Sequence, residues 1–302
     1  MSSSLYPRQA GARRDGGVAL LFLAPWLIGL LVFTIGPVLA TLYLSFTDYR
    51  VLSPPRWVGL ENYKELFTDT ETFWPSLGNT AFLFLELPLS LLLGLALALL
   101  LNQKLKGMAL FRTIFYVPAL VPTVAGSMLW LWLLNPEHGL INEALRTLHI
   151  PTPTWLASPL WAKPAIILMD LWGVGGSMVI YLAALQGVPQ DYYEAAELDG
   201  ASGWHCLRHI TLPSLSPVIF FNLILGVIGT FQYFTQTFLM TKGGPDKSTL
   251  FYALYLYQNA FEYFRMGLAC AMAWVLFLLT IAATWLVFKS SARWVYYEGE
   301  KA

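Results

Sequence analysis

Long apolar stretches alternate with short polar ones along the whole 302-residue chain. A helix rises 1.5 Å per residue, so about 20 apolar residues cross the ~30 Å hydrocarbon core of a bilayer. Six stretches meet this requirement, and we expect each to be a transmembrane helix. They are Val18–Phe46, Ala81–Leu101, Ile114–Leu134, Ala165–Leu185, Val218–Met240 and Gly267–Phe288. The pattern therefore predicts an all-α polytopic membrane protein, with one six-helix domain over residues 18–288 between tails of residues 1–17 and 289–302.

Composition agrees with this prediction and removes other classes of protein. Hydrophobic residues make up 57% of the chain and charged residues 12%, about half the share that is usual in globular proteins. The net charge is zero, so no basic field favours nucleic acid as a partner. Cys206 and Cys270 lie in separate segments, without the spacing of a metal site or a disulfide framework.

The distribution of Lys and Arg predicts the orientation. The two tails and segment 102–113 contain nine of these residues in 43 positions, whereas the three intervening polar segments contain eight in 90. Positively charged segments stay on the cytoplasmic side of a membrane. We therefore expect both termini to be cytoplasmic, together with the polar segment 186–217.

The centre of that segment, "PQDYYEAAELDGASGWHCLRHITLP" over residues 189–213, is the most polar part of the chain between two predicted spans. Its first proline and acidic residues suit the start of a short helix. Gly200 can end that helix in a left-handed conformation, and Ser202 can cap a second one. We expect Leu212 and Pro213 to end the second helix. By charge pattern alone, the segment could be a solvated helical hairpin without a partner.

The pattern E-A-A-x3-G-x9-I-x-L-P in this segment resembles the coupling loop of binding-protein-dependent ABC importer permeases. The residues that match it are Glu194, Ala195, Ala196, Gly200, Ile210, Leu212 and Pro213. Other stretches, including "WVGLENYKELF", "TKGGP" and "FRMGLACAMAWVLF", are similar to the sugar-permease branch with maltose-type and glycerol-3-phosphate-type subunits. The resemblance covers nearly the whole chain and implies the type I ABC importer permease fold.

The resemblance also implies a set of partners. A second homologous permease would complete the pathway, and two nucleotide-binding subunits would bind ATP and Mg, since this chain lacks the G-x4-G-K-[ST] motif. An extracytoplasmic binding protein would deliver a sugar or a related polyol or sugar phosphate. The chain itself would contain no cofactor, metal or catalytic residue, and would sit among lipids in a bacterial or archaeal cytoplasmic membrane.

Candidate substrate residues lie in the predicted fourth and fifth spans. An ionisable residue within a span is costly and suggests function, and sugars bind to aromatic faces flanked by hydrogen-bonding groups. This reasoning selects Asp170, Trp172, Thr230, Tyr233 and Gln236, and the resemblance adds Gly173, Gly176 and Gly226 as contact positions. Packing of the two aromatic residues between helices is the alternative, and Glu86 is interpreted as structural.

The alternatives are an ion-coupled secondary transporter and a metal site in the polar segment. An ion-coupled secondary transporter would show two inverted halves with paired broken helices, and no such internal similarity is evident. His205 and His209 are four residues apart, as metal ligands can be, but no third ligand is near in the sequence, and we expect them on the loop surface.

Overall fold

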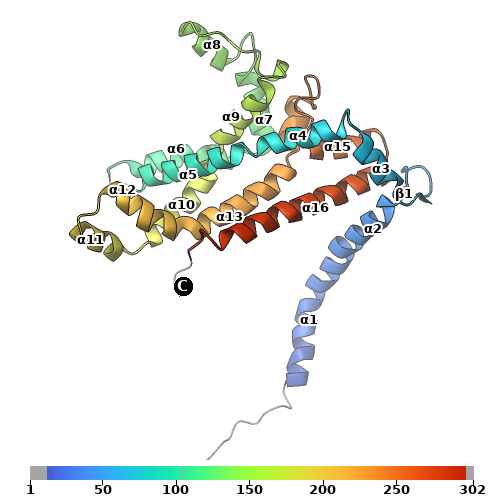
Figure 1. The fold of residues 1–302 in the computed structure, drawn as a ribbon, viewed down its shortest axis with the longest axis horizontal. Helices are drawn as coiled ribbons and strands as arrows, with labels where there is room; N and C mark the ends of the chain where they lie inside the picture. The colour runs from blue at the N-terminus through green and yellow to red at the C-terminus, as the bar shows by residue number, and fades with distance from the viewer. Residues whose placement is uncertain (1–11, 104, 297–302) are drawn as a thin grey trace, which may run out of the picture.

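The computed structural model describes residues 12–103 and 105–296 of the chain, and helices make up most of them (Figure 1). One short antiparallel ladder pairs β1 (Thr47–Asp48) with β2 (Arg56–Trp57). The predominance of helices confirms the all-α fold class. The outer parts of the two predicted tails, residues 1–11 and 297–302, lie outside the described residues, as does Lys104.

The first span is a helical arm that projects from the rest of the molecule (Figure 1). It consists of α1 (Ala12–Leu30), the π-helix η1 (Leu31–Ile35) and α2 (Gly36–Ser45). The wide π turn lies directly before Pro37, where the missing N–H and the ring disfavour a regular α-helix. Within the arm, α2 packs on the body of the chain, chiefly against α16. The most apolar window of the arm has none of its residues buried within the chain.

Three further spans form the main bundle, in which α5, α13 and α16 run side by side (Figure 1). The second span joins α4 (Phe73–Leu83) to α5 (Glu86–Leu101), and the fifth contains α13 (Leu212–Phe231) and α14 (Thr235–Met240). The sixth span is α16 (Met266–Ser291). The largest apolar cluster at the inner ends of the spans includes Ala98, Tyr181 and Leu215, and it joins α5, α10 and α13.

The third and fourth spans are each broken into two helices, which the hydrophobic pattern did not reveal. The third consists of α6 (Met108–Leu120) and α7 (Thr123–Leu133) with a bend of 99°, and the fourth of α9 (Ala162–Trp172) and α10 (Gly175–Gly187) with a bend of 43°. Pro122 explains the first break, because the residue before a proline favours an extended backbone. The chain thus has six spans when each bent pair counts as one.

Short helices connect the spans at both ends of the bundle. One end carries α3 (Glu61–Thr68), α15 (Tyr252–Tyr257) and the π-helix η4 (Gln258–Glu262), while α8 (Leu140–Thr147) and the 3₁₀ helix η2 (Trp155–Ala157) connect α7 to α9, and α8 projects from the side of the bundle in Figure 1. The other end carries α11 (Gln190–Leu198), α12 (Gly203–Cys206) and the π-helix η3 (Leu207–Thr211). By the predicted orientation, the first set is external and the second is cytoplasmic.

Asp69 joins α3 to α15 at the end of the bundle opposite α11. Its carboxylate accepts hydrogen bonds from the Tyr255 hydroxyl at 2.9 Å and from the backbone N–H groups of Glu71, Thr72 and Phe73. Partial burial acts to raise the pKa of Asp69, but these hydrogen bonds stabilise the charged form more, and its pKa is lowered. The charged carboxylate therefore stabilises the folded state.

We expect Asp69→Asn to lower the melting temperature of the assembled protein at pH 7 by about 2–4 °C, the shift that ~1 kcal/mol produces in a chain of this size class. Because the folded pKa lies below the unfolded one, the contribution is complete above about pH 4 and is lost as the pH falls through the folded value. The difference from the parent protein should therefore shrink in acid. Asp246→Asn, at an exposed position, is the control. Equal melting temperatures of the Asp69 variant and the parent at pH 7 would contradict this role.

Candidate functional site

The polar segment 189–213 folds into two helices with the boundaries expected at Gly200 and Ser202. Gly200 has φ +78°, its N–H donates to the Glu197 carbonyl at 3.0 Å, and the next N–H, of Ala201, donates to the Ala196 carbonyl at 2.9 Å. This is the Schellman arrangement, which favours glycine because a β-carbon is strained at positive φ. The Ser202 hydroxyl then accepts the His205 N–H at 3.3 Å and caps α12.

The expected end of the second helix at Leu212 and Pro213 is wrong. The helix continues from α12 through η3 into α13, so the helix that contains the fifth span begins at Gly203, before the predicted start of the span at Val218. Proline is tolerated here because η3 provides a wide π turn directly before it. The Thr211 hydroxyl in η3 also shares a 3.0 Å hydrogen bond with the Tyr193 hydroxyl of α11. The short helix α11 is therefore tied directly to a transmembrane helix.

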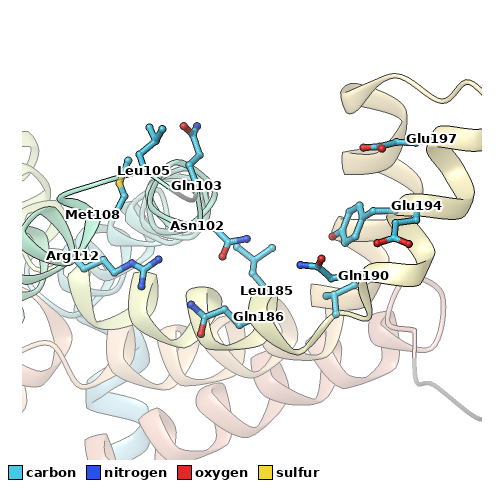
Figure 2. Close-up of a pocket in the computed structure, with 12 residues that line it drawn as sticks. Asn102, Gln103, Leu105, Met108, Arg112, Leu185, Gln186, Gln190, Glu194 and Glu197 are labelled. Atoms are coloured by element: carbon cyan, nitrogen blue, oxygen red, sulfur yellow. The ribbon is translucent and has the colours of Figure 1, made fainter.

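A groove of about 750 Å³ separates α11 from the connection between α5 and α6 (Figure 2). Glu194 and Glu197 lie on its α11 side, and Asn102, Gln103 and Arg112 lie across from them. The guanidinium of Arg112 donates two hydrogen bonds to the Leu101 carbonyl, at 2.8 and 3.1 Å, and forms no ion pair with either glutamate. The two glutamates form no ion pair with any residue between 12 and 103 or between 105 and 296. Their charges remain available to a basic partner.

Two exposed apolar side chains of α11 and α12 were missed by the sequence reasoning. Leu198, at the end of α11, is 90% exposed, and Trp204, in α12, is 70% exposed. Neither residue belongs to a membrane-spanning stretch of the predicted topology, so both would face water. Exposed large apolar residues next to uncompensated charges are typical of a protein interface. Hydrophobic periodicity gives no signal for Leu198 and Trp204, but their large apolar side chains in an otherwise polar segment could have drawn attention to them.

A second cavity, of about 290 Å³, lies between the spans. Its lining residues come from α4, α5, α9, α13, α14 and the α13–α14 connection, and they are Leu83, Glu86, Asp170, Gly226, Gly229, Thr230, Tyr233 and Gln236. Five of the eight predicted substrate residues thus come together. Glu86, interpreted from the sequence as structural, also lines this cavity. The break between α9 and α10 places Asp170 near the end of a helix, so the bend in the fourth span helps to position a carboxyl group in the cavity.

The other three predicted substrate residues, Trp172, Gly173 and Gly176, do not line this cavity. Trp172 packs edge-to-face against Trp130 of α7, with 6.1 Å between the ring centroids, and is still 37% exposed. A β-carbon at Gly176 would be in ordinary contact with Ala119 of α6, at 3.8 Å. Counting residues back from the E-A-A and G-G-P motifs placed these positions at the site, whereas in the structure Trp172 lies beside α7 and Gly176 beside α6.

The His205 and His209 side chains stack with 4.1 Å between ring centroids on the exposed surface of the loop. The Nδ1 atom of His209 lies 3.1 Å from the His205 carbonyl oxygen, a contact local to this turn. No third ligand completes a metal site among residues 12–103 and 105–296. Both histidines therefore lie on the surface of this segment.

Comparisons with known proteins agree with these features. Residues 90–295 match the family model described as binding-protein-dependent transport system inner membrane component. The probable ABC transporter permease protein YesP of Bacillus subtilis is 41% identical, over 96% of this chain and 95% of its own length. The trehalose/maltose transport system permease protein MalF of Thermococcus litoralis is 34% identical over 90% of this chain and 92% of its own. The lactose transport system permease protein LacF of Rhizobium radiobacter is 35% identical over 89% of this chain and 92% of its own.

Solved structures show the same fold. A chain of a bacterial alginate ABC transporter, crystallised with an alginate pentasaccharide-bound periplasmic protein, superposes with a TM-score of 0.81. The two chains are 24% identical, and the match covers 93% of this chain and 96% of the other. The likeness supports the arrangement of the spans described above.

Proposed function

The chain belongs to the family of binding-protein-dependent transport system inner membrane components, and on that premise we propose that it imports a sugar, or a related polyol or sugar phosphate, as the permease subunit of an ATP-driven transporter. The observation that carries the choice of substrate class is that the relatives MalF and LacF, matched over about nine-tenths of this chain, are named for trehalose, maltose and lactose. Transport, rather than a chemical reaction, is the activity of such a subunit.

The exposed face of α11 and α12 is the proposed docking surface for an ATPase subunit. It combines the free charges of Glu194 and Glu197 with the exposed side chains of Leu198 and Trp204. Because α11 is hydrogen-bonded to η3, and η3 continues into α13, a displacement of α11 moves a transmembrane helix. ATP and Mg would bind to two such ATPase subunits, and their closing motion would switch the pathway between its two orientations.

The helical arm α1–α2 is the proposed contact surface for a second, homologous permease. Its apolar window is unburied within the chain, and helices in membranes associate through close packing of their faces. The tails and α11 would lie in the cytoplasm, and α3, α8 and α15 would lie outside. A solute-binding protein would deliver the substrate to that external end.

The cavity between the spans is the proposed substrate site, with Asp170, Tyr233 and Gln236 as hydrogen-bonding groups. Its volume of about 290 Å³ suits one part of a small saccharide, and the second permease would complete the enclosure. Gly226 allows close approach of α13 to Leu87, because a β-carbon there would lie 2.6 Å from the leucine side chain.

The test of the proposed function is the ATPase activity of the complex that co-purifies with a tagged copy of the chain from its native membrane. Activity stimulated by the binding protein loaded with one member of a sugar panel is the expected result. A chain that purifies without an ATPase, and transports equally well in vesicles depleted of ATP, would contradict the proposal and favour an ion-coupled secondary transporter.

Two substitutions distinguish a residue that binds substrate from one that packs between helices. Asp170→Ala should raise the sugar concentration for half-maximal uptake about tenfold, since a lost hydrogen bond costs up to about 1.5 kcal/mol, without changing the amount of assembled complex. Trp172→Ala should instead reduce the amount of assembled complex, because it removes the contact with Trp130. A higher half-saturation concentration for the Trp172 variant, with normal assembly, would return this residue to the substrate site.

A further inference from the structure

We propose that a basic pocket at the external end of the chain binds an acidic side chain of the solute-binding protein, an inference that rests on the proposed function. The pocket has a volume of about 460 Å³ and lies between the start of α4, the loop 241–250 and helices α15 and η4. In Figure 1, α15 lies beside α4 and near α3, at the end of the bundle opposite α11. Its lining includes Thr72, Lys242, Lys247, Gln258, Tyr263 and Arg265.

The charges of this pocket are unbalanced. It is lined by three cationic side chains and no carboxylate among the residues that the structure describes. Arg265 is neutralised, because its guanidinium pairs with Glu65 at 2.6 Å. Lys247 bonds only to neutral acceptors, the Glu71 carbonyl at 3.2 Å and the Thr72 hydroxyl at 2.9 Å. Lys242 is exposed and forms no ion pair within residues 12–103 and 105–296. About two positive charges are therefore uncompensated.

The loop that carries these lysines is held in an unfavourable backbone conformation. Lys242, Asp246 and Lys247 have φ values of 51°, 48° and 55°, in a region that side-chain-bearing residues rarely occupy. Each such residue costs on the order of 1 kcal/mol, and such costs concentrate at functional sites. The buried Thr249 fixes the loop, since its hydroxyl donates to the Gly244 carbonyl at 2.6 Å and lies 2.7 Å from the Thr241 hydroxyl. The backbone that carries the lysines is thus held in place before a partner arrives.

The chemistry of the other lining groups fits a carboxylate ligand. Two exposed ammonium groups attract it over a distance, while the amide of Gln258 and the phenol of Tyr263 can donate hydrogen bonds at short range. Charged groups at the rim of an interface mainly accelerate association and choose the partner. An Asp or Glu on the docking face of the solute-binding protein is the occupant that these groups favour.

The experiment measures ATP hydrolysis by the complete transporter in nanodiscs as its own sugar-loaded binding protein is titrated, at about 50 and about 300 mM NaCl. Lys242→Glu should raise the concentration of binding protein for half-maximal stimulation about tenfold at low salt, and less at high salt, because salt screens exposed charges. The matched control is Lys64→Glu, an equally charged change on exposed α3 outside this pocket, which should leave the titration unchanged.

Four results would overturn the proposal. An unchanged titration for Lys242→Glu, with normal stimulation of the parent complex, would overturn the pocket alone. An equal shift for Lys64→Glu would show a general effect of charge. A shift that appears only with an acidic sugar would make the glycan the ligand instead of the protein. A parent complex that no binding protein stimulates would overturn the proposed function and this pocket together.

Discussion

Replacing Glu194 with lysine is expected to reduce sugar uptake at least tenfold while the chain still inserts into the membrane and folds. Glu194 lies on the exposed α11 helix and faces the groove of Figure 2 without an ion-pair partner among the described residues. Opposed like charges at an interface cost several kcal/mol. A cost of about 3 kcal/mol would weaken docking of the ATPase about 100-fold. Uptake and the amount of ATPase retained on the tagged chain are the two measurements.

Asp191→Lys is the control for this experiment. Asp191 is exposed in the first turn of the same helix, so the substitution makes the same change in charge, but it does not line the groove. We expect most of the ATPase to be retained in this variant. If both variants lose the ATPase equally, the net charge of α11 is what matters. If both transport normally, α11 is not the docking helix.

A methyl group at Gly175 should prevent the chain from reaching its folded, assembled state. A β-carbon at this position would lie 2.0 Å from the Phe115 carbonyl oxygen and 2.9 Å from the Tyr116 α-carbon, so α10 touches the backbone of α6. Backbone cannot move aside as a flexible side chain can, and overpacking of this kind costs at least about 3 kcal/mol. We expect Gly175→Ala to lower sharply the fraction of protein that elutes as an assembled complex in detergent.

Gly176, the next residue, offers a control with the same glycine-to-alanine change. A β-carbon at Gly176 would be 3.8 Å from the Ala119 side chain, an ordinary contact, so Gly176→Ala should assemble like the parent chain. If both variants assemble like the parent chain, α6 and α10 are not in backbone contact. If both lose assembly equally, this bend tolerates no side chain at either position.

The sequence predicted the number of spans well, because apolar length is a strong signal that needs no knowledge of neighbouring helices. It also predicted Gly200 and Ser202 as helix boundaries, since capping depends on local chemistry. It did not predict that Pro213 lies within a continuous helix. A proline signals a break, but whether a helix ends or only widens there depends on the preceding turn, which here is the π-helix η3.

The candidate substrate site shows a similar division. Asp170, Thr230 and Tyr233 were selected because polar groups in a span need a reason to be there, and the structure places them on one cavity. Glu86 satisfied the same rule and was set aside, although it also lines that cavity. Trp172 was selected for its aromatic ring and for its position relative to the E-A-A motif, which the resemblance implies is a contact position. Its direction depends on the 43° bend between α9 and α10, and two glycines in a run of apolar residues do not specify an angle.

The arm formed by α1 and α2 also has a consequence for biogenesis. It precedes the other five spans in this sequence, yet its apolar window contains no residue buried against them. Lipid must therefore solvate this segment from the moment it enters the bilayer until another polypeptide displaces that lipid. An orphan copy would leave this helix exposed to lipid, and a membrane protease that recognises unshielded spans would use it to remove subunits made in excess.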